Sequence, residues 1–111
     1  MPRDYKVYLE DIVEAIGKIR EYTTGLPVES FLRDSKTIDA VVRNLEIVGE
    51  AIKNVPEEIR MQHLDIEWRK IAGLRDILIH EYFGIDSDII WDIIQNKLPV
   101  LEAQVRTILQ T

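Results

Sequence analysis

The sequence has 111 residues, a formal net charge of −6 at pH 7, and 46% hydrophobic and 31% charged residues. This length and composition predict a single globular domain over residues 1–111. The acidic balance argues against nucleic-acid binding through an overall basic surface, although a small basic cleft on an acidic body stays possible. The chain has no cysteine, which excludes a disulfide framework, a zinc–thiolate site and a cysteine nucleophile.

Targeting signals are not evident in the sequence. The first ten residues, "MPRDYKVYLE", contain no apolar segment of the kind that a secretion signal needs. No apolar run approaches the roughly 18 residues that span a bilayer, so we expect no membrane insertion. Together with the lack of cysteine, these features favour a cytoplasmic location.

Apolar residues recur at helical spacing in five segments, which predict helices at about residues 4–23, 36–54, 67–83, 88–96 and 100–109. Asp4, Asp34 or Ser35, and Asp86 or Ser87 are candidate N-caps for three of these helices. Short helices or turns are expected around residues 27–34 and after Pro56, which suits a first helical position.

Helix ends are marked by glycine and proline. Gly25 is expected to end the first helix and Gly84 the third, and Pro99 is expected to separate the last two. No segment alternates with the period of two that a strand requires. Amphipathic helices joined by short connections predict an all-α, antiparallel up-and-down bundle of about four long helices with additional short ones.

Arg75 is the anomaly in the third long helix. On an ideal helical wheel of about 100° per residue it falls at the centre of an apolar arc, with Trp68 and Ile71 on either side. Burying an unpaired guanidinium costs several kcal/mol, so a carboxylate, a phosphate or a subunit interface must face it. A central position also predicts that Arg75→Ala disturbs folding.

Two residues of the second long helix are candidate partners for Arg75. Asn44 and Glu46 flank its apolar stripe at about 100° on either side of Leu45. One interpretation is a core arginine paired with Glu46. The other is chemical, because the planar guanidinium fork suits phosphate and carboxylate groups. The wheel does not decide between them.

His80 lies about 140° around the helix from Arg75 and about 7.5 Å further along its axis. An ideal single helix would not bring these two side chains together. They could converge if the helix unwinds near Gly84, or if two copies of the helix meet in a dimer. A histidine near a helix C-terminus also commonly complements the helix dipole, which is the simpler interpretation.

The segment "RDILIHEY", residues 75–82, resembles the motif of the HEPN superfamily. Arg75, Asp76, His80 and Tyr82 match the extended motif of the HepT-like toxins in identity and spacing. The segments "RNLEIVGEAIK", "WRKIAGLRD" and "DIIWDII" also resemble family sequences, so the resemblance covers essentially the whole chain.

The resemblance implies an up-and-down helical bundle, commonly dimeric, in which the motifs of two protomers form a cleft. It also implies a metal-independent endoribonuclease toxin without a cofactor. The expected partner is a cognate minimal nucleotidyltransferase antitoxin, which transfers AMP to the motif tyrosine, here Tyr82. Some members of the superfamily only bind RNA or nucleotides, so a non-catalytic binding module is one alternative. A structural bundle with a buried Arg–Glu pair is the other.

The residue types suit RNA cleavage in which the 2′-hydroxyl of the substrate attacks the phosphate. His80 can move protons near neutral pH, and Arg75 can stabilise the transition-state charge. Asp76 can orient the histidine or hold the arginine, with Asn44 and Glu46 in support. A metal site is not expected, because the two histidines lie far apart and Asp86 and Asp88 fit capping roles.

Overall fold

The computed structural model describes residues 4–80 and 86–110, with the backbone alone for Ile77, Ile79 and His80. Every regular element in that part of the chain is helical, which confirms the predicted all-α class. In chain order the elements are α1 (Tyr5–Thr23), α2 (Val28–Arg33), α3 (Ser35–Asn54), α4 (Glu57–Gln62), α5 (Trp68–His80), α6 (Ser87–Asp92), the π-helix η2 (Ile93–Lys97) and α7 (Leu98–Leu109).

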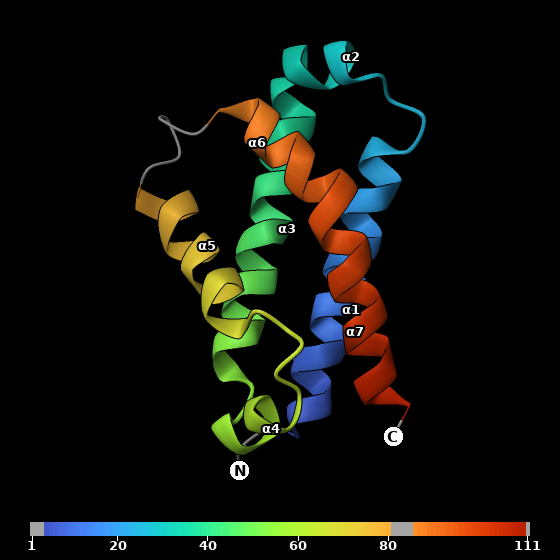
Figure 1. Ribbon diagram of the computed structural model, residues 1–111. Coiled ribbons are helices and arrows are strands. Elements are labelled where there is room, and N and C mark those ends of the chain that lie inside the picture. The colour runs from blue at the N-terminus through green and yellow to red at the C-terminus, as the bar shows by residue number, and fades with distance from the viewer. Residues whose placement is uncertain (1–3, 81–85, 111) are drawn as a thin grey trace.

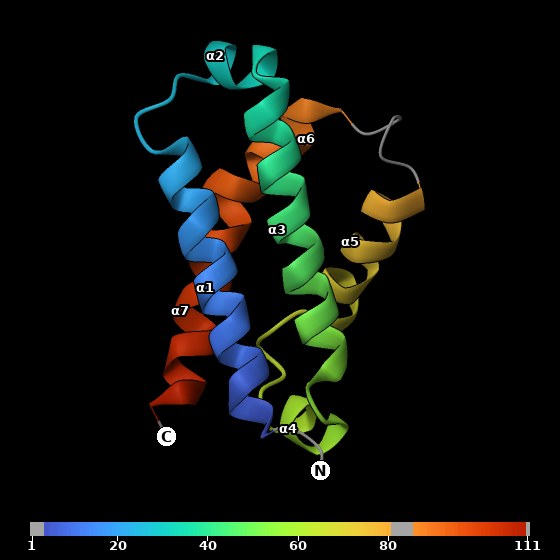
Figure 2. The ribbon, with the colours of Figure 1, turned by 180° about the vertical axis from the view of Figure 1, so that it is seen from behind.

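The long helices run up and down in an antiparallel bundle (Figure 1). The short helix α2 joins α1 to α3 at one end, and α4 joins α3 to α5 at the end that holds both termini. Seen from either side, α3 lies between α1 and α5 (Figure 2). It packs extensively on both, while α7 covers α1. The predicted up-and-down arrangement is therefore confirmed.

The hydrophobic core lies between α1, α3 and α7. Aliphatic side chains that are almost completely buried supply most of it, namely Leu9, Ile12, Ile16 and Ile19 of α1, Val41, Leu45, Val48 and Ile52 of α3, and Leu101, Val105 and Ile108 of α7. These residues follow the helical spacing that predicted the elements, because one apolar face of each helix has to leave water. The core therefore holds α3 in place, and α5 packs against α3.

Capping explains where the two longest helices begin. The carboxylate of Asp4 accepts a hydrogen bond from the backbone N–H of Lys6. The carboxylate of Asp34 accepts from the hydroxyl of Thr37 at 2.7 Å and from its backbone N–H at 3.1 Å. Those two hydrogen bonds, the hydroxyl first, lower the pKa of Asp34 below its usual range. The predicted caps of α1 and α3 are confirmed, with Asp34 rather than Ser35 at the second.

Pro99 does not separate two helices, which corrects the prediction. The helical backbone continues from Ser87 to Leu109, with Pro99 in the first turn of α7. Proline lacks an N–H and its ring collides with the carbonyl four residues earlier, so an ordinary α-helix would break there. Here the preceding turn, η2, is a π-helix, whose wider spacing accommodates the proline without ending the helix.

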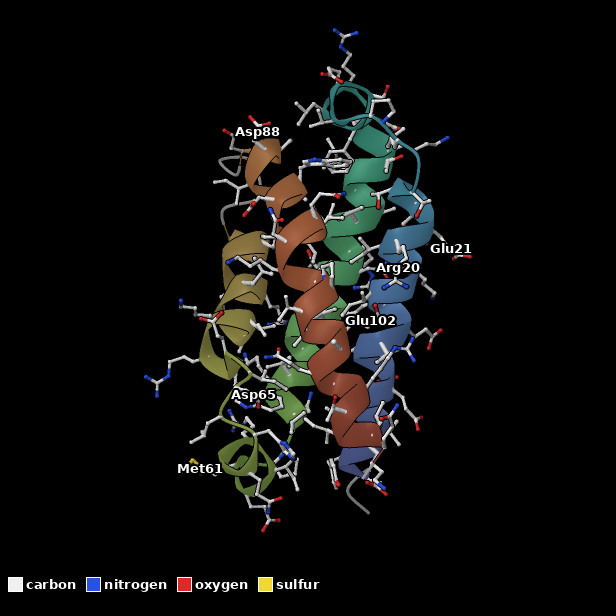
Figure 3. The ribbon with its side chains drawn as sticks, turned by 45° about the vertical axis from the view of Figure 1, so that its right-hand side comes forward. Arg20, Glu21, Met61, Asp65, Asp88 and Glu102 are labelled. Carbon is white, nitrogen blue, oxygen red and sulfur yellow. The ribbon has the colours of Figure 1, made fainter. Side chains whose placement is uncertain are left out.

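A buried carboxylate ties α7 to α1. Glu102 of α7 is nearly buried and forms an ion pair with Arg20 of α1, toward which it points in Figure 3. Its other oxygen lies 3.1 Å from Arg106, one turn further along α7. Because both arginines reach solvent, the triad brings a net positive charge to this side of the bundle.

Two hydrogen bonds hold the loop that leads into α5. The indole N–H of Trp68 donates to the backbone carbonyl of His63 at 2.9 Å. The side-chain amide of Gln104 donates to the carbonyl of Asp65, also at 2.9 Å, which connects the loop to α7. The start of α5 is therefore fixed.

Within residues 4–80 and 86–110, no helix is both long enough and apolar enough to cross a membrane.

Candidate active site

The motif helix α5 lies in close contact with α3 at Gly49. A Cβ atom added to Gly49 would stand 2.6 Å from the Cβ of Arg75 and 3.3 Å from its Cα. Carbon atoms make favourable contacts only at about 3.5–4.0 Å, so no larger residue fits here without displacing α5. The stem of Arg75 therefore rests directly on the backbone of α3, in the direction that the helical wheel predicts.

The Arg75 side chain, however, is not fully buried, which speaks against the first of the two interpretations, a core arginine. The side chain is 30% exposed, and its Nε lies 2.9 Å from a carboxylate oxygen of Glu50. Glu50 itself is 54% exposed. The Gly49 contact leaves no room for the long side chain between the helices. The Arg75 side chain therefore runs along the surface of α3, with its aliphatic stem covered and its guanidinium near water.

Asp76 supplies a second carboxylate to the same guanidinium. Its Oδ1 lies 3.8 Å from Nη1 of Arg75, and its side chain is exposed. Of the two alternatives predicted for Asp76, this contact places it beside the arginine. Glu50 therefore faces one edge of the guanidinium and Asp76 one of its terminal nitrogens, while the group as a whole stays partly open to solvent.

A cavity of about 270 Å³ opens beside Arg75. Side chains of three helices line it, namely Tyr8 and Asp11 of α1, Arg43, Glu46, Ile47, Glu50, Ala51 and Asn54 of α3, and Arg75 of α5. The wall carries two guanidinium groups and three carboxylates. Among the described residues that line the cavity, Arg43 and Arg75 carry the positive charges that a phosphate could meet.

Glu46 lines this cavity but is not the carboxylate that holds Arg75. Its Oε2 lies 4.0 Å from Arg43, one turn earlier on α3, and the predicted Arg75–Glu46 pair is replaced by Arg75–Glu50. Glu50 lies one turn beyond Glu46 and next to Gly49, which is the point where Arg75 touches α3. The register of α5 along α3 therefore determines that Glu50, rather than Glu46, pairs with Arg75.

Asn44 lies on the other flank of α3, and the structure does not bring it to Arg75. Its side chain is only 6% exposed and donates a hydrogen bond to the carbonyl of Ala40 at 2.9 Å. Gly49, which marks the side that faces α5, is five residues away and therefore about 140° around the helix. Asn44 is absent from the cavity wall beside Arg75.

His80 is the last residue of α5, at the end of the helix that leads away from α4. The structure gives its backbone alone, and Tyr82 and Gly84 lie outside the described residues. The convergence of Arg75 with His80, and the position of Tyr82, therefore stay predictions. Among the residues that the structure describes, no cluster of histidine, aspartate and glutamate could hold a metal ion.

Comparison with known proteins gives a consistent result. A family model described as "Ribonuclease HepT-like" matches residues 12–108, which include both α3 and the motif helix α5. The chain belongs to the ribonuclease HepT-like family. It is 47% identical over 104 residues to a protein named "Probable ribonuclease HepT" from Thermococcus cleftensis, with 94% of each chain covered. No solved structure gave a significant match.

Two further relatives are named as putative RNases. A "Putative RNase" from Caldanaerobacter subterraneus is 48% identical over 103 residues, which cover 93% of this chain and 92% of that one. A "Gamma-glutamylcyclotransferase and putative RNase" from Methanocaldococcus jannaschii is 40% identical over 110 residues, which are 99% of this chain but 50% of that protein. Sequence similar to this chain thus occurs as half of a larger protein.

Glu50 is the site residue that sequence reasoning missed. It lies about 140° from the centre of the apolar stripe of α3, beyond Glu46, so the wheel ranks it as the poorer candidate. The available signal was Gly49. A glycine inside an otherwise strong helix pattern often marks the close approach of another backbone. Residues next to such a contact are well placed to meet the side chain that makes it.

Proposed function

We propose that this HepT-like chain is an endoribonuclease that cleaves RNA without a metal ion, and that residues 1–111 act as one catalytic domain. Membership of the family supports the ribonuclease activity. The observation that carries the proposal is the position of Arg75. The guanidinium of the family motif is partly open to solvent at the rim of a cavity, where a phosphate can reach it.

In the proposed reaction, the 2′-hydroxyl of a ribose attacks the adjacent phosphorus and the bond to the 5′-oxygen breaks. His80 moves protons, because its unperturbed pKa lies near working pH. Arg75 stabilises the doubly charged transition state with its charge and its paired N–H groups. The products are a 2′,3′-cyclic phosphate on one fragment and a 5′-hydroxyl on the other.

Three further residues are proposed to support this site with different weight. Asp76 contacts the guanidinium of Arg75 and would help to hold it. Glu46 shares the cavity wall with Arg75 and would act on substrate through its neighbour Arg43. Asn44 is buried on the far flank of α3, so within one chain its support would be structural.

The alternatives differ in what they require of Arg75. A purely structural bundle needs an arginine shut inside the core, and the exposure of the Arg75–Glu50 pair speaks against that alternative. A non-catalytic module that binds RNA or nucleotide needs the same open guanidinium as the enzyme does. Cleavage itself therefore separates the binding module from the ribonuclease.

We propose that the protein acts as a homodimer or a higher even oligomer. The support is geometric, since Arg75 and the Cα of His80 lie about 140° apart on one helix and converge most easily across two chains. Sedimentation at micromolar concentration is expected to give a species of at least twice the 12.9 kDa chain mass. A stable monomer would contradict this part of the proposal.

We further propose that the protein is the toxin of a toxin–antitoxin pair. A cognate minimal nucleotidyltransferase would silence it by transferring AMP to Tyr82. The added phosphate would introduce negative charge close to the residues that receive RNA phosphate, so one modification would block the site by size and by repulsion. The family motif supports this mechanism through the spacing of Tyr82 from Arg75 and His80.

The experiment that tests the function is incubation of the purified protein with total cellular RNA in the presence of EDTA. We expect cleavage that leaves 2′,3′-cyclic phosphate ends, and no cleavage by His80→Ala prepared in parallel. Activity that requires magnesium, or that persists in the His80→Ala preparation, would refute the mechanism. RNA binding without cleavage would favour the non-catalytic module.

A further inference from the structure

Glu50 is the residue of this site that neither the motif nor the family comparison singles out. We infer that Glu50 is a positioning residue for RNA cleavage, which acts by holding the guanidinium of Arg75 through its Nε so that the terminal nitrogens face the substrate phosphate. This inference rests on the proposed ribonuclease function and extends it to one more side chain.

The first support is that Gly49 and Glu50 contact opposite ends of the Arg75 side chain. Gly49 admits the stem, because any side chain at that position would overlap the Cβ of Arg75. Glu50, the next residue, meets the far end of the same side chain at 2.9 Å. An arginine side chain is thereby fixed at both ends by two consecutive residues of a helix whose inner face lies in the core.

The second support is which nitrogen Glu50 uses. Guanidinium carries one N–H at Nε and four at the two terminal nitrogens. Glu50 forms its ion pair at Nε, with an N···O distance of 2.9 Å, and the terminal nitrogen nearest Asp76 is 3.8 Å from it, beyond hydrogen-bond distance. The paired N–H groups at the end of the fork are the ones that bind phosphate oxygens in a bidentate way. Glu50 thus restrains Arg75 without using that end.

The third support concerns charge. Glu50 is the carboxylate that gives the cavity wall three carboxylates against two guanidiniums, and the whole chain is acidic. This negative charge disfavours binding of an RNA backbone, so Glu50 does not contribute to affinity. Preorganised donors act where charge develops in the transition state, and a restrained donor needs no reorganisation at that moment. The expected contribution of Glu50 is therefore to kcat, at some expense in KM.

The test compares Glu50→Ala and Glu50→Gln, using as substrate the shortest oligoribonucleotide that the wild-type protein cleaves. The amide of glutamine keeps a polar oxygen of the same reach beside Nε, whereas alanine removes it. We expect kcat to fall at least tenfold in Glu50→Ala and to stay within about threefold in Glu50→Gln, a window set by the modest worth of one hydrogen bond. KM is expected to be equal or lower in both variants, because each removes a negative charge.

Glu14→Ala is the matched control for charge. Glu14 lies on α1, pairs with Lys18 at 3.7 Å and is exposed, so its removal changes the net charge by the same amount away from Arg75. Its kcat is expected to equal that of the wild type. Thermal unfolding of every variant, followed by circular dichroism, separates an effect on Arg75 from a loss of fold. Should Glu50→Ala unfold, Glu50→Asp replaces it, because the shorter side chain withdraws the carboxylate.

Several results would overturn the inference. One is a kcat for Glu50→Ala within twofold of the wild type. Another is an equal loss of kcat in Glu50→Ala and Glu50→Gln, which would implicate the net charge of the cavity rather than the contact at Nε. A third is a rise in kcat, which would make Glu50 a competitor of the phosphate. Failure of the proposed function gives a different pattern, because the wild-type protein would then cleave no RNA at all.

Discussion

Gly49 of α3 lies in direct contact with Arg75 of α5, and the space between them is too small for a single methyl group. This contact sets both the distance between the two helices and the path of the arginine side chain. Because the stem of Arg75 lies on the α3 backbone, the guanidinium extends sideways from the contact, toward Glu50. The geometry of the candidate site therefore depends on one residue that has no side chain.

Gly49→Ala is expected to lower both stability and activity. The overlap with Arg75 resembles overpacking of a core, which costs about 1–3 kcal/mol. Alanine recovers up to about 1 kcal/mol through its better helix propensity. Gly17→Ala is the control, because a Cβ there meets nothing within 4 Å. Denaturant unfolding should show Gly17→Ala more stable than the wild type and Gly49→Ala less stable; equal stabilisation of both would contradict the contact.

Arg75→Ala is expected to abolish RNA cleavage while leaving the fold intact. The Arg75–Glu50 pair is partly exposed, and pairs of this kind contribute about 0–1 kcal/mol to the free energy of unfolding. Loss of one transition-state donor typically costs about 100- to 1,000-fold in kcat. Cleavage assays together with denaturant unfolding check both parts. Unfolding of Arg75→Ala would restore the interpretation of a structural arginine, which the exposure of the guanidinium now disfavours.

Glu102→Ala is expected to destabilise the bundle without a direct effect on the site. Its carboxylate is nearly buried between Arg20 and Arg106, so alanine leaves two guanidinium groups without their shared partner. The loss of charged hydrogen bonds predicts a cost of about 1–3 kcal/mol. Glu14→Ala, which removes an exposed pair with Lys18, should cost less than about 0.5 kcal/mol. Chemical denaturation of both variants provides the comparison.

The Asp34 cap predicts one component of the acid sensitivity of the fold. Hydrogen bonds from Thr37 lower the pKa of Asp34 below its ordinary value of 3.8. The folded state therefore binds this proton less readily than the unfolded state does. The stability that the cap contributes is complete above pH 3.8 and is lost as pH falls through the lowered pKa.

Asp34→Asn tests that component, because asparagine also caps helices but does not titrate in this range. Thermal unfolding midpoints measured between pH 2 and pH 6 should fall less steeply on acidification in Asp34→Asn than in the wild type. Parallel curves for the two proteins would show that the Asp34 carboxylate does not contribute to the pH dependence.

Tyr82 provides the test of the proposed silencing. Co-expression with the cognate nucleotidyltransferase is expected to raise the intact mass by one or more AMP units, and peptide mapping should place them on Tyr82. Tyr82→Phe should gain no mass, because phenylalanine has no hydroxyl to modify. If Tyr82→Phe still gains AMP, or if modified protein cleaves RNA as fast as unmodified protein, the proposed silencing is wrong.

Much of the bundle follows from local sequence signals. The predicted bounds of the first two long helices lie within a residue of those of α1 and α3, because each combines an apolar stripe with an aspartate cap. Pro99 was misleading for a physical reason. Its usual helix-breaking effect depends on α-helical spacing, and the widened turn that removes the conflict has no signature in the residue types.

The candidate site was predictable only in part. The motif identified Arg75 and Asp76, and the wheel gave the direction of the Arg75 stem correctly. Which carboxylate meets the guanidinium depends on how far α5 slides along α3, and that register is a property of two packed surfaces. A difference of one turn exchanges Glu46 for Glu50, and the apolar pattern of α3 alone favours the wrong one of the two.

The packing of α5 against α3 has a consequence for how the protein loses activity. Within the part of the chain that the structure describes, α5 packs extensively only on α3 and buries the side chains of Trp68 and Leu78, whereas α7 buries Leu98, Leu101, Val105 and Ile108. Segments that bury less apolar surface open at lower free energy than the molecule as a whole. Mild denaturant should therefore detach the motif helix first, in a sub-global opening that leaves an inactive but still folded three-helix remnant.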